Sequence, residues 1–132
     1  MALVPVQGEL TVQAPQLAGE VRAATRFPVF HATRIQDVAT ARHAIAAGKV
    51  DMIGMTRAHM ADPQIMRKIR EKREDDIRPC VGATYCLDRI YENGRATCIH
   101  NPATGREETE PHLIPTADKK KTVVIVGAGP AG

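Results

Sequence analysis

The fold is decided by two short apolar runs, FPVFHATR at residues 27–34 and DMIGMTR at residues 51–57. Each run contains strand-favouring Phe, Val or Ile and ends in the same Thr-Arg pair. Between them, residues 37–48 carry apolar side chains at helical spacing and end at Gly48, a residue type that commonly follows the end of a helix. A strand, a helix and a second strand in this order predict the crossover unit of a parallel sheet, so the sequence indicates the α/β class.

Helices are expected on both sides of this unit. Residues 16–25 have apolar side chains at helical spacing, and Asp62-Pro63 supplies a capping residue and a first-turn proline for a helix that leads into the charged run 70–76. Residues 1–14 contain prolines and glutamines without a clear period, so they are expected to form a loop. Since parallel strands are covered on both faces, two strands cannot complete the sheet, and further strands are expected.

Composition excludes several classes of function. The chain has 132 residues, of which 43% are hydrophobic and 25% are charged, as in ordinary soluble globular proteins. The net charge of +3 is too small to favour a nucleic-acid partner. No run approaches the ~18 apolar residues of a membrane span, and the N-terminus lacks the features of a signal peptide. The three cysteines, an odd number, favour a ligand or redox cluster in the cytoplasm over a disulfide framework.

The two Thr-Arg pairs stand where the two predicted strands end. They are Thr33-Arg34 and Thr56-Arg57. Because the carboxyl ends of neighbouring parallel strands meet at one edge of a sheet, these hydroxyl and guanidinium groups would make a phosphate-binding site. The alternative is that the arginines are ordinary solvated residues on loops, and the sequence leaves both interpretations open.

Three cysteines, Cys80, Cys86 and Cys98, fall in one short segment. Clustered thiolates on a loop suit an iron–sulfur cluster or a zinc ion. His100 follows the last cysteine closely and could complete a Cys3His zinc site. The remaining alternative is that the three cysteines merely pack.

The last residues, TVVIVGAGPAG at 122–132, predict a buried strand that leads into a dinucleotide-binding turn. Gly127, Gly129 and Gly132 would provide the tight turn, the close approach to a pyrophosphate and the packing of helix on strand. The phosphate-binding helix and the ribose-binding acidic residue of this motif would come after Gly132, so these residues by themselves cannot bind a dinucleotide. A chance glycine-rich stretch is the alternative.

Taken in order, the motifs resemble those of the Old Yellow Enzyme-like iron–sulfur flavoproteins. The resemblance covers residues 15–132 and rests on FPVFHATRI, DMIGMTRAHMADP, IRPCVGATYC, CIHNPATG and VVIVGAGPAG. The family includes enzymes of the trimethylamine dehydrogenase, 2,4-dienoyl-CoA reductase and N-methylproline or dimethylglycine demethylase types. The sequence CVGATYCLDRIY is most similar to that of the amine-demethylase branch.

The resemblance implies a division of the chain into parts of a longer protein. Residues 1–77 would be the C-terminal part of an FMN-binding TIM (β/α)8 barrel, with its seventh and eighth strands. Residues 78–108 would be the iron–sulfur segment, residues 109–121 a linker, and residues 122–132 the start of a Rossmann-like domain for FAD or NAD(P). A whole barrel takes about 250 residues, so this chain would not be active alone.

The resemblance also implies cofactor ligands. The two Thr-Arg pairs match the positions that hold the FMN phosphate, and the three cysteines match the first, third and fourth ligands of the family's cluster. Ala83 stands at the position of the second ligand. The site could then hold a [3Fe–4S] cluster, a [4Fe–4S] cluster with a ligand other than cysteine, or no cluster. Tyr85, Asp88 and His100 are the nearby groups that could serve as that ligand.

The implied activity is oxidation of a small N-methylated amine, with demethylation. A hydride equivalent would pass to FMN, and electrons would leave singly through the cluster towards the second nucleotide domain or an external electron-transfer partner. NAD(P)H-dependent reduction of an enoate or a 2,4-dienoyl-CoA is an alternative, and a Cys3His zinc module without a redox role is another. The intact protein is expected to form a homo-oligomer, and its catalytic acid or base would lie on earlier strands, outside these residues.

Overall fold

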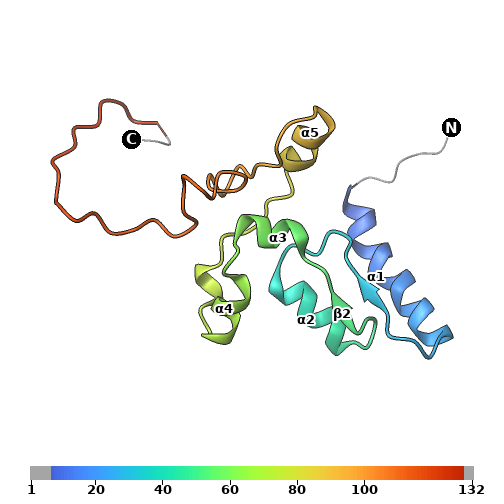
Figure 1. Cartoon of the computed structure of the whole chain (residues 1–132). Coiled ribbons are helices and arrows are strands. Elements are labelled where there is room, and N and C mark those ends of the chain that lie inside the picture. Colours follow the sequence, from blue (N-terminus) through green and yellow to red (C-terminus); the bar gives the residue numbers. More distant parts are fainter. Residues whose placement is uncertain (1–6, 130–132) are drawn as a thin grey trace.

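The computed structural model describes residues 7–129, which form short helices, one two-stranded sheet and long irregular segments. In chain order the elements are α1 (Gln7–Ala24), β1 (Phe30–His31), α2 (Val38–Ala46), β2 (Met52–Ile53), α3 (Thr56–Ala61), α4 (Ile65–Arg70), the 3-10 helix η1 (Glu74–Asp76) and α5 (Tyr85–Tyr91). No helix or strand follows α5 within the described residues, and the last part of the chain runs away from the helical body, at the left of Figure 1.

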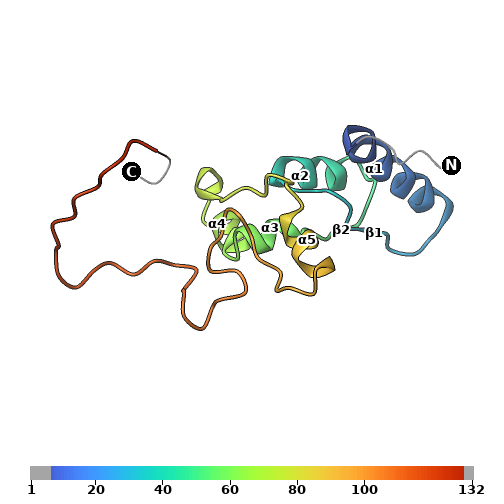
Figure 2. The same cartoon turned by 90° about the horizontal axis from the view of Figure 1, so that it is seen from above.

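The two strands form the parallel pair that the sequence predicts. Phe30 lies opposite Met52 and His31 opposite Ile53, and α2 makes the crossover between them. Figure 2 shows α1 and α2 on one side of the pair. Phe30 and Met52 remain 64% and 52% exposed, so the sheet is not covered on both faces. The predicted parallel strand–helix–strand unit is therefore confirmed.

Local sequence explains the ends of α2. The Asp37 carboxylate accepts hydrogen bonds from the backbone amide of Thr40 at 2.7 Å and from its hydroxyl at 2.8 Å, so it caps the helix. After the helix, Gly48 takes the left-handed conformation at φ 66°, which a glycine adopts without steric cost. Both features agree with the helix predicted between residues 37 and 48.

The N-terminal helix is longer than predicted. α1 begins at Gln7 and continues across Pro15, so the prediction of a loop is wrong for residues 7–14. That stretch contains Glu, Leu, Gln and Ala, which favour helix, and a single internal proline removes one hydrogen bond without necessarily ending a helix. Residues 1–6 lie outside the described residues.

The predicted helix after Asp62 is present as α4, but α3 was not predicted. α3 is six residues long and begins at Thr56 without a side-chain cap, so neither a period nor a capping residue marks it in the sequence. α3 turns the chain directly after β2, and this places Arg57 and Met60 on a helix rather than on a loop.

The strand predicted at residues 122–126 is wrong in this structure. The segment is irregular, and Val124 and Val126 are 83% and 96% exposed. A strand needs a neighbour to accept its backbone hydrogen bonds, and no other strand pairs with this segment in the described part of the chain. The predicted first strand of a Rossmann-like domain is therefore not formed in this structure.

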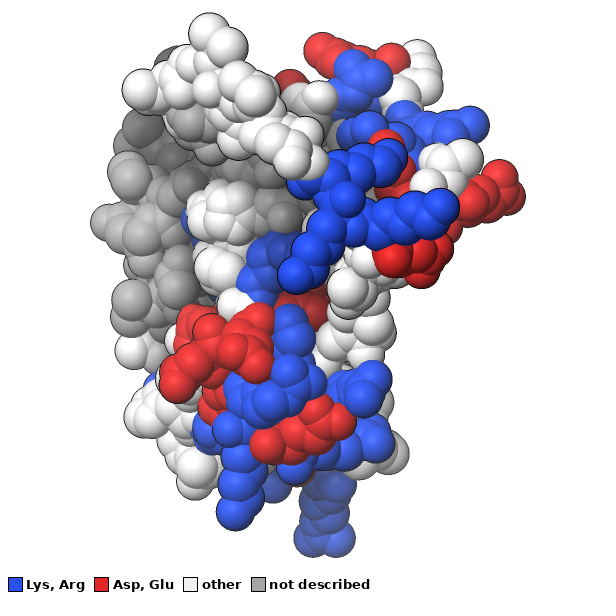
Figure 3. All heavy atoms as spheres, turned by 90° about the vertical axis from the view of Figure 1, so that its left-hand side faces the viewer, with Lys and Arg blue, Asp and Glu red and all other residues white. Residues whose placement is uncertain are grey.

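The buried core is small. Its apolar members come from α2, α3, α4 and the segments beside them, and most are alanines: Ile35, Ala41, Ala44, Val50, Ala58, Ala61, Ile65 and Ala103. Figure 3 shows basic and acidic side chains interleaved over the face that it displays, without one dominant sign. Within the residues described, no helix combines the length and apolar character needed to cross a membrane.

Candidate functional site

The three cysteines line one cavity. Cys80, Cys86 and Cys98 share it with His100, and α3 contributes Arg57 and Met60 to its wall. All three cysteines are free thiols and half-buried. The structure thus brings together cysteines that are up to eighteen positions apart in the predicted iron–sulfur segment.

Two left-handed residues shape the loop between Cys80 and Cys86. Gly82 has φ 70°, and Thr84, just before α5, has φ 59°. A Cβ atom at position 82 would lie 2.7 Å from Nε2 of Gln36, so this position requires a glycine unless Gln36 moves. Nε2 of Gln36 is itself buried and has no hydrogen-bond partner within the described residues.

The same loop presents backbone amides without partners. In the part of the chain that the structure describes, the amides of Val81, Gly82, Ala83 and Thr84 donate no backbone hydrogen bond. Successive free amides in a loop with left-handed residues form the concave sites that bind anions and iron–sulfur clusters. Together with the three thiols, these amides make a donor set that suits an iron–sulfur cluster.

Asp62 anchors the beginning of the cysteine segment. Its carboxylate is buried and accepts hydrogen bonds from the Arg78 amide at 2.9 Å, the Lys68 ammonium at 2.5 Å and the Gln64 amide at 2.9 Å. Burial by itself would raise the pKa of Asp62, but these donors outweigh it and hold the pKa below its usual value. The carboxylate therefore fixes the chain two residues before Cys80.

Asn101 and Thr104 anchor the other end of the segment. The Asn101 amide, which is 1% exposed, and the Thr104 hydroxyl both donate to the Met60 carbonyl, at 2.8 Å and 2.9 Å. Asn101 also contacts Nδ1 of His112 at 3.1 Å. Both ends of the cysteine segment are thus tied to the region around α3 and α4.

The cavity is not arranged for one metal ion. Among residues 7–129, no group of three or more His, Cys, Asp or Glu side chains lies close enough to hold a single ion. The arrangement gives no support to the Cys3His zinc alternative. An iron–sulfur cluster is larger than one ion, so its ligands stand farther apart, and the three cysteines line one cavity.

The Thr-Arg pairs follow neighbouring strands, as predicted. Thr33 and Arg34 come after β1, where Arg34 has φ 53°, while Thr56 and Arg57 begin α3 directly after β2. The strands stay in contact at this end, since the Gly54 amide donates to the His31 carbonyl at 2.8 Å. The assignment of the pairs to a phosphate site remains a prediction.

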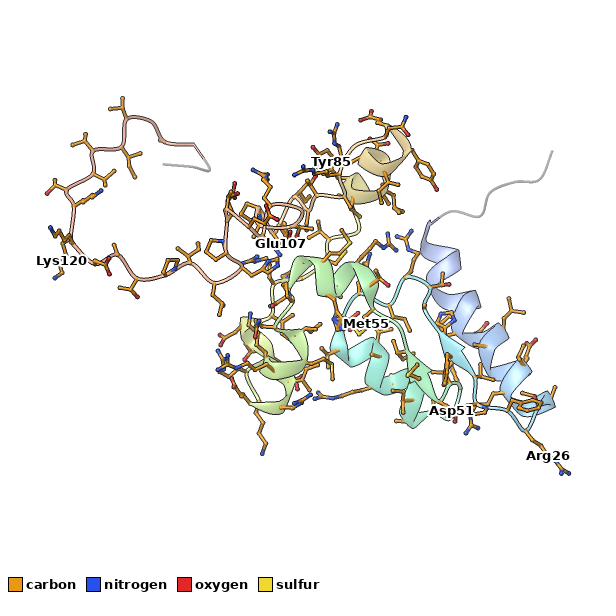
Figure 4. All side chains as sticks on the ribbon, in the orientation of Figure 1. Arg26, Asp51, Met55, Tyr85, Glu107 and Lys120 are labelled. Carbon is orange, nitrogen blue, oxygen red and sulfur yellow. The ribbon has the colours of Figure 1, made fainter. Side chains whose placement is uncertain are left out.

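The carboxyl ends of the strands face the cysteine segment. Figure 4 shows Asp51, just before β2, at the far end of the sheet from Tyr85 of α5, with Met55 between them. Arg57 belongs both to the Thr-Arg pairs and to the wall of the cysteine cavity. The two predicted cofactor sites are therefore neighbours in the structure.

The glycine-rich turn is not assembled with the rest of the site. Gly127 has φ 136°, and no atom lies within 4 Å of a Cβ atom built on Gly127 or Gly129. Gly132 lies outside the described residues.

Sequence patterns did not predict the contacts of Gln36 and Asn101 or the anchoring role of Asp62, because the partners of these residues are distant along the chain.

Comparison with known proteins relates the chain to one group of enzymes. No protein-family model matches it. It is 67% identical to "Probable N-methylproline demethylase" of Rhizobium meliloti, over 98% of this chain and 19% of that protein. It is 50% identical to "Multifunctional alkene reductase/demethylase OYE" of Caballeronia cordobensis, over 100% of this chain and 19% of that protein. The chain is therefore similar to a segment of enzymes of the Old Yellow Enzyme-like type. The resemblance seen in its motifs is thereby confirmed.

A solved structure shows the same relation in three dimensions. The 2-naphthoyl-CoA reductase complexed with 2-naphthoyl-CoA matches with a TM-score of 0.75 and 30% identity, over 89% of this chain and 18% of that chain. The chain spans about a fifth of the length of the curated relatives, 19% of each of the two named above. Its similarity therefore covers a segment of those enzymes and not their whole length.

Proposed function

We propose that these residues hold cofactors in a flavin- and iron–sulfur-dependent oxidoreductase that oxidatively demethylates a small N-methylated amine. The observation that carries the proposal is the 67% identity to a protein named N-methylproline demethylase, over 98% of this chain. A protein named N,N-dimethylglycine/sarcosine dehydrogenase, from Chromohalobacter salexigens, is 47% identical over 88% of the chain. Both names describe amines that carry methyl groups on nitrogen.

The strand–helix unit is assigned to the end of a TIM barrel. In such barrels a phosphate commonly binds beside the loops after the seventh and eighth strands. Thr33, Arg34, Thr56 and Arg57 follow two adjacent parallel strands, and their hydroxyl, guanidinium and amide groups are suited to clamp the FMN phosphate. The uncovered face of the sheet agrees with a barrel completed by strands outside these residues.

The cysteine cavity is assigned to the iron–sulfur cluster. Cys80, Cys86 and Cys98 would ligate iron as thiolates, and the free loop amides would donate to the cluster sulfurs. When bound, the flavin accepts a hydride equivalent from the substrate, and the cluster carries single electrons away. The task of these residues is to bind and orient both groups, while the acid or base and the substrate contacts lie elsewhere in the protein.

The division of the chain follows from this assignment. Residues 1–77 belong to the barrel, residues 78–108 to the cluster segment, and residues 109–121 to the linker. Residues 122–132 begin a domain for FAD or NAD(P), in which Gly127, Gly129 and Gly132 would approach the pyrophosphate. An external electron-transfer partner and a homo-oligomer of the intact protein complete the proposal. The three free thiols favour a reducing compartment, the cytoplasm.

Reduction of an activated alkene is the second candidate function. The relative from Caballeronia cordobensis is named as both an alkene reductase and a demethylase, and the solved structural neighbour is named as a reductase. In this case the flavin would deliver a hydride to an enoate or an enoyl-CoA instead of receiving one from an amine.

One assay separates the two candidates. The purified flavoprotein that contains these residues is supplied with N-methylproline, dimethylglycine or dimethylamine and an artificial electron acceptor, and formaldehyde is measured. In parallel, the same protein is supplied with NAD(P)H and cinnamate, and loss of the alkene is measured. Formaldehyde release with at least one amine supports demethylation. Alkene reduction without formaldehyde from any amine would replace the first proposal with the second.

A further inference from the structure

We infer that His100 supplies the ligand that the three cysteines leave missing, so that this chain holds a [4Fe–4S] cluster with a Cys3His set of ligands. The inference rests on the proposed iron–sulfur role and deepens it by naming the fourth ligand. A [4Fe–4S] cluster takes one protein ligand for each iron, usually a thiolate. The cysteine segment supplies three thiolates and has Ala83 at the position of the second expected ligand, so one iron lacks a thiolate from this segment.

The position of His100 fits this role. His100 lines the same cavity as Cys80, Cys86 and Cys98. Imidazole is an established replacement for thiolate in iron–sulfur proteins, since two histidines ligate one iron in Rieske centres. A neutral imidazole offers the lone pair of one ring nitrogen without losing a proton.

The hydrogen bond of His100 fixes which ring nitrogen is free. Nδ1 lies 2.8 Å from the Pro79 carbonyl oxygen, which can only accept, so Nδ1 must carry the proton and donate it. Nε2 is then unprotonated in the neutral ring, and no hydrogen bond occupies it within the part of the chain described. Ligating histidines in metalloproteins characteristically donate their other ring N–H to a backbone carbonyl or a carboxylate, which orients the ring. Pro79 immediately precedes Cys80, so the same turn holds the ring and the first thiol.

The other two candidates fit less well. Asp88 and His100 are both exposed, but Asp88 does not line the cavity. Tyr85 does line the cavity, but its phenol must lose a proton before it becomes a ligand. His100 needs no such change. Among the three groups singled out from the sequence, the structure favours the histidine.

The test is a spectroscopic one on the whole chain. The protein is reconstituted anaerobically with ferrous iron and sulfide, reduced with dithionite and examined by pulsed EPR, with natural and with ¹⁵N-labelled histidine. We expect about four irons per chain and a nitrogen coupling that changes with the label. His100→Ala should lose the coupling and about one iron in four, giving a [3Fe–4S] signal in the oxidised protein.

Two variants control for folding and for position. His100→Cys should keep the full iron content and lose only the nitrogen coupling, which shows that the position carries a ligand. His43→Ala removes an exposed histidine on α2 that does not line the cavity, and it should keep both the iron and the coupling. Far-UV circular dichroism checks that each variant is folded.

The outcomes distinguish this inference from the proposed function. A [4Fe–4S] cluster without histidine coupling, or a [3Fe–4S] cluster in the unaltered chain, overturns the assignment of His100 and leaves the iron–sulfur role standing. Failure of the unaltered chain to take up any cluster overturns both the assignment and the iron–sulfur part of the proposed function.

Discussion

Two segments of this chain carry clear motifs, but they differ in how firmly the rest of the structure holds them. The cysteine segment is tied down at both ends: the Arg78 amide bonds Asp62, and Asn101 bonds the Met60 carbonyl. The glycine-rich segment has no such ties, and its Val124 is 83% exposed. A motif names the chemistry of a segment, but the segment takes its shape only where a neighbouring element offers partners for its polar groups and cover for its apolar ones.

The largest effect is expected from removing the Asp62 carboxylate, which holds the beginning of the cysteine segment. Asp62→Ala would leave the mostly buried Lys68 ammonium without its acidic partner and the Arg78 amide without its acceptor, so we expect the free energy of unfolding to fall by about 3 kcal/mol. Urea denaturation measures this loss. Hydrogen exchange should accelerate at residues 78–80, which the lost bond had held.

A matched aspartate controls for the removal of charge. Asp75 is exposed on η1, so Asp75→Ala should change the free energy of unfolding by less than about 0.5 kcal/mol. Equal losses in the two variants would contradict an anchoring role for Asp62.

Removing the hydrogen bond from Asn101 to the Met60 carbonyl should lower the free energy of unfolding by somewhat less. Asn101→Ala deletes a buried amide that bonds the Met60 carbonyl and contacts His112, and we expect a loss of about 2 kcal/mol, with faster exchange across residues 98–104. The other asparagine, Asn93, is exposed and has φ 59°, so Asn93→Gly should leave the stability unchanged or raise it slightly. Unaltered exchange in Asn101→Ala would show that the segment is held by other contacts.

Low pH should destabilise the cysteine segment by protonating the Asp62 carboxylate. Because the folded pKa of Asp62 lies below its usual value of about 3.9, its stabilising contribution is complete above that value and is lost as the pH falls through the folded pKa. The free energy of unfolding of the unaltered chain should therefore fall more steeply below about pH 4 than that of Asp62→Asn. Urea titrations between neutral pH and strong acid measure both curves, and parallel curves would exclude this linkage.

Local sequence was sufficient where structure depends on near neighbours. The β1–α2–β2 unit and Gly48 after the end of α2 could both be predicted, because each follows from residues within one element or its flanks. The extension of α1 to Gln7 and the short helix α3 were missed, since residues 7–14 lack a clear apolar period and α3 has no capping side chain.

The residue types of the candidate site could be predicted from the sequence, but the residues that hold the site in place could not. Cys80, Cys86 and Cys98 stand out in the sequence, and the structure gathers them at one cavity. Asn101 and the Met60 carbonyl are 41 positions apart, and Gln36 approaches Gly82 from a different part of the chain. No local sequence pattern predicts such contacts, so only the structure identifies the supporting residues.

The smallest effect is expected in the glycine-rich segment, and the same substitution at two valines tests it. Val124 is largely exposed and has no strand beside it, so Val124→Ala should leave the free energy of unfolding within about 0.5 kcal/mol of the unaltered value. Val50, just before β2, is 2% exposed, and Val50→Ala should cost about 2 kcal/mol through lost burial and the cavity left behind.

Urea denaturation of both valine variants decides whether the two segments truly differ. A substantial loss for Val124→Ala would mean that the apolar run 122–126 is buried against the body in solution, and the contrast with the cysteine segment would disappear. A loss confined to Val50→Ala means that the apolar side chains of this run gain nothing from the rest of the chain. Their conversion into a buried strand then depends on a neighbouring strand that these residues do not themselves supply, because burial and backbone pairing, not β-propensity, stabilise a strand.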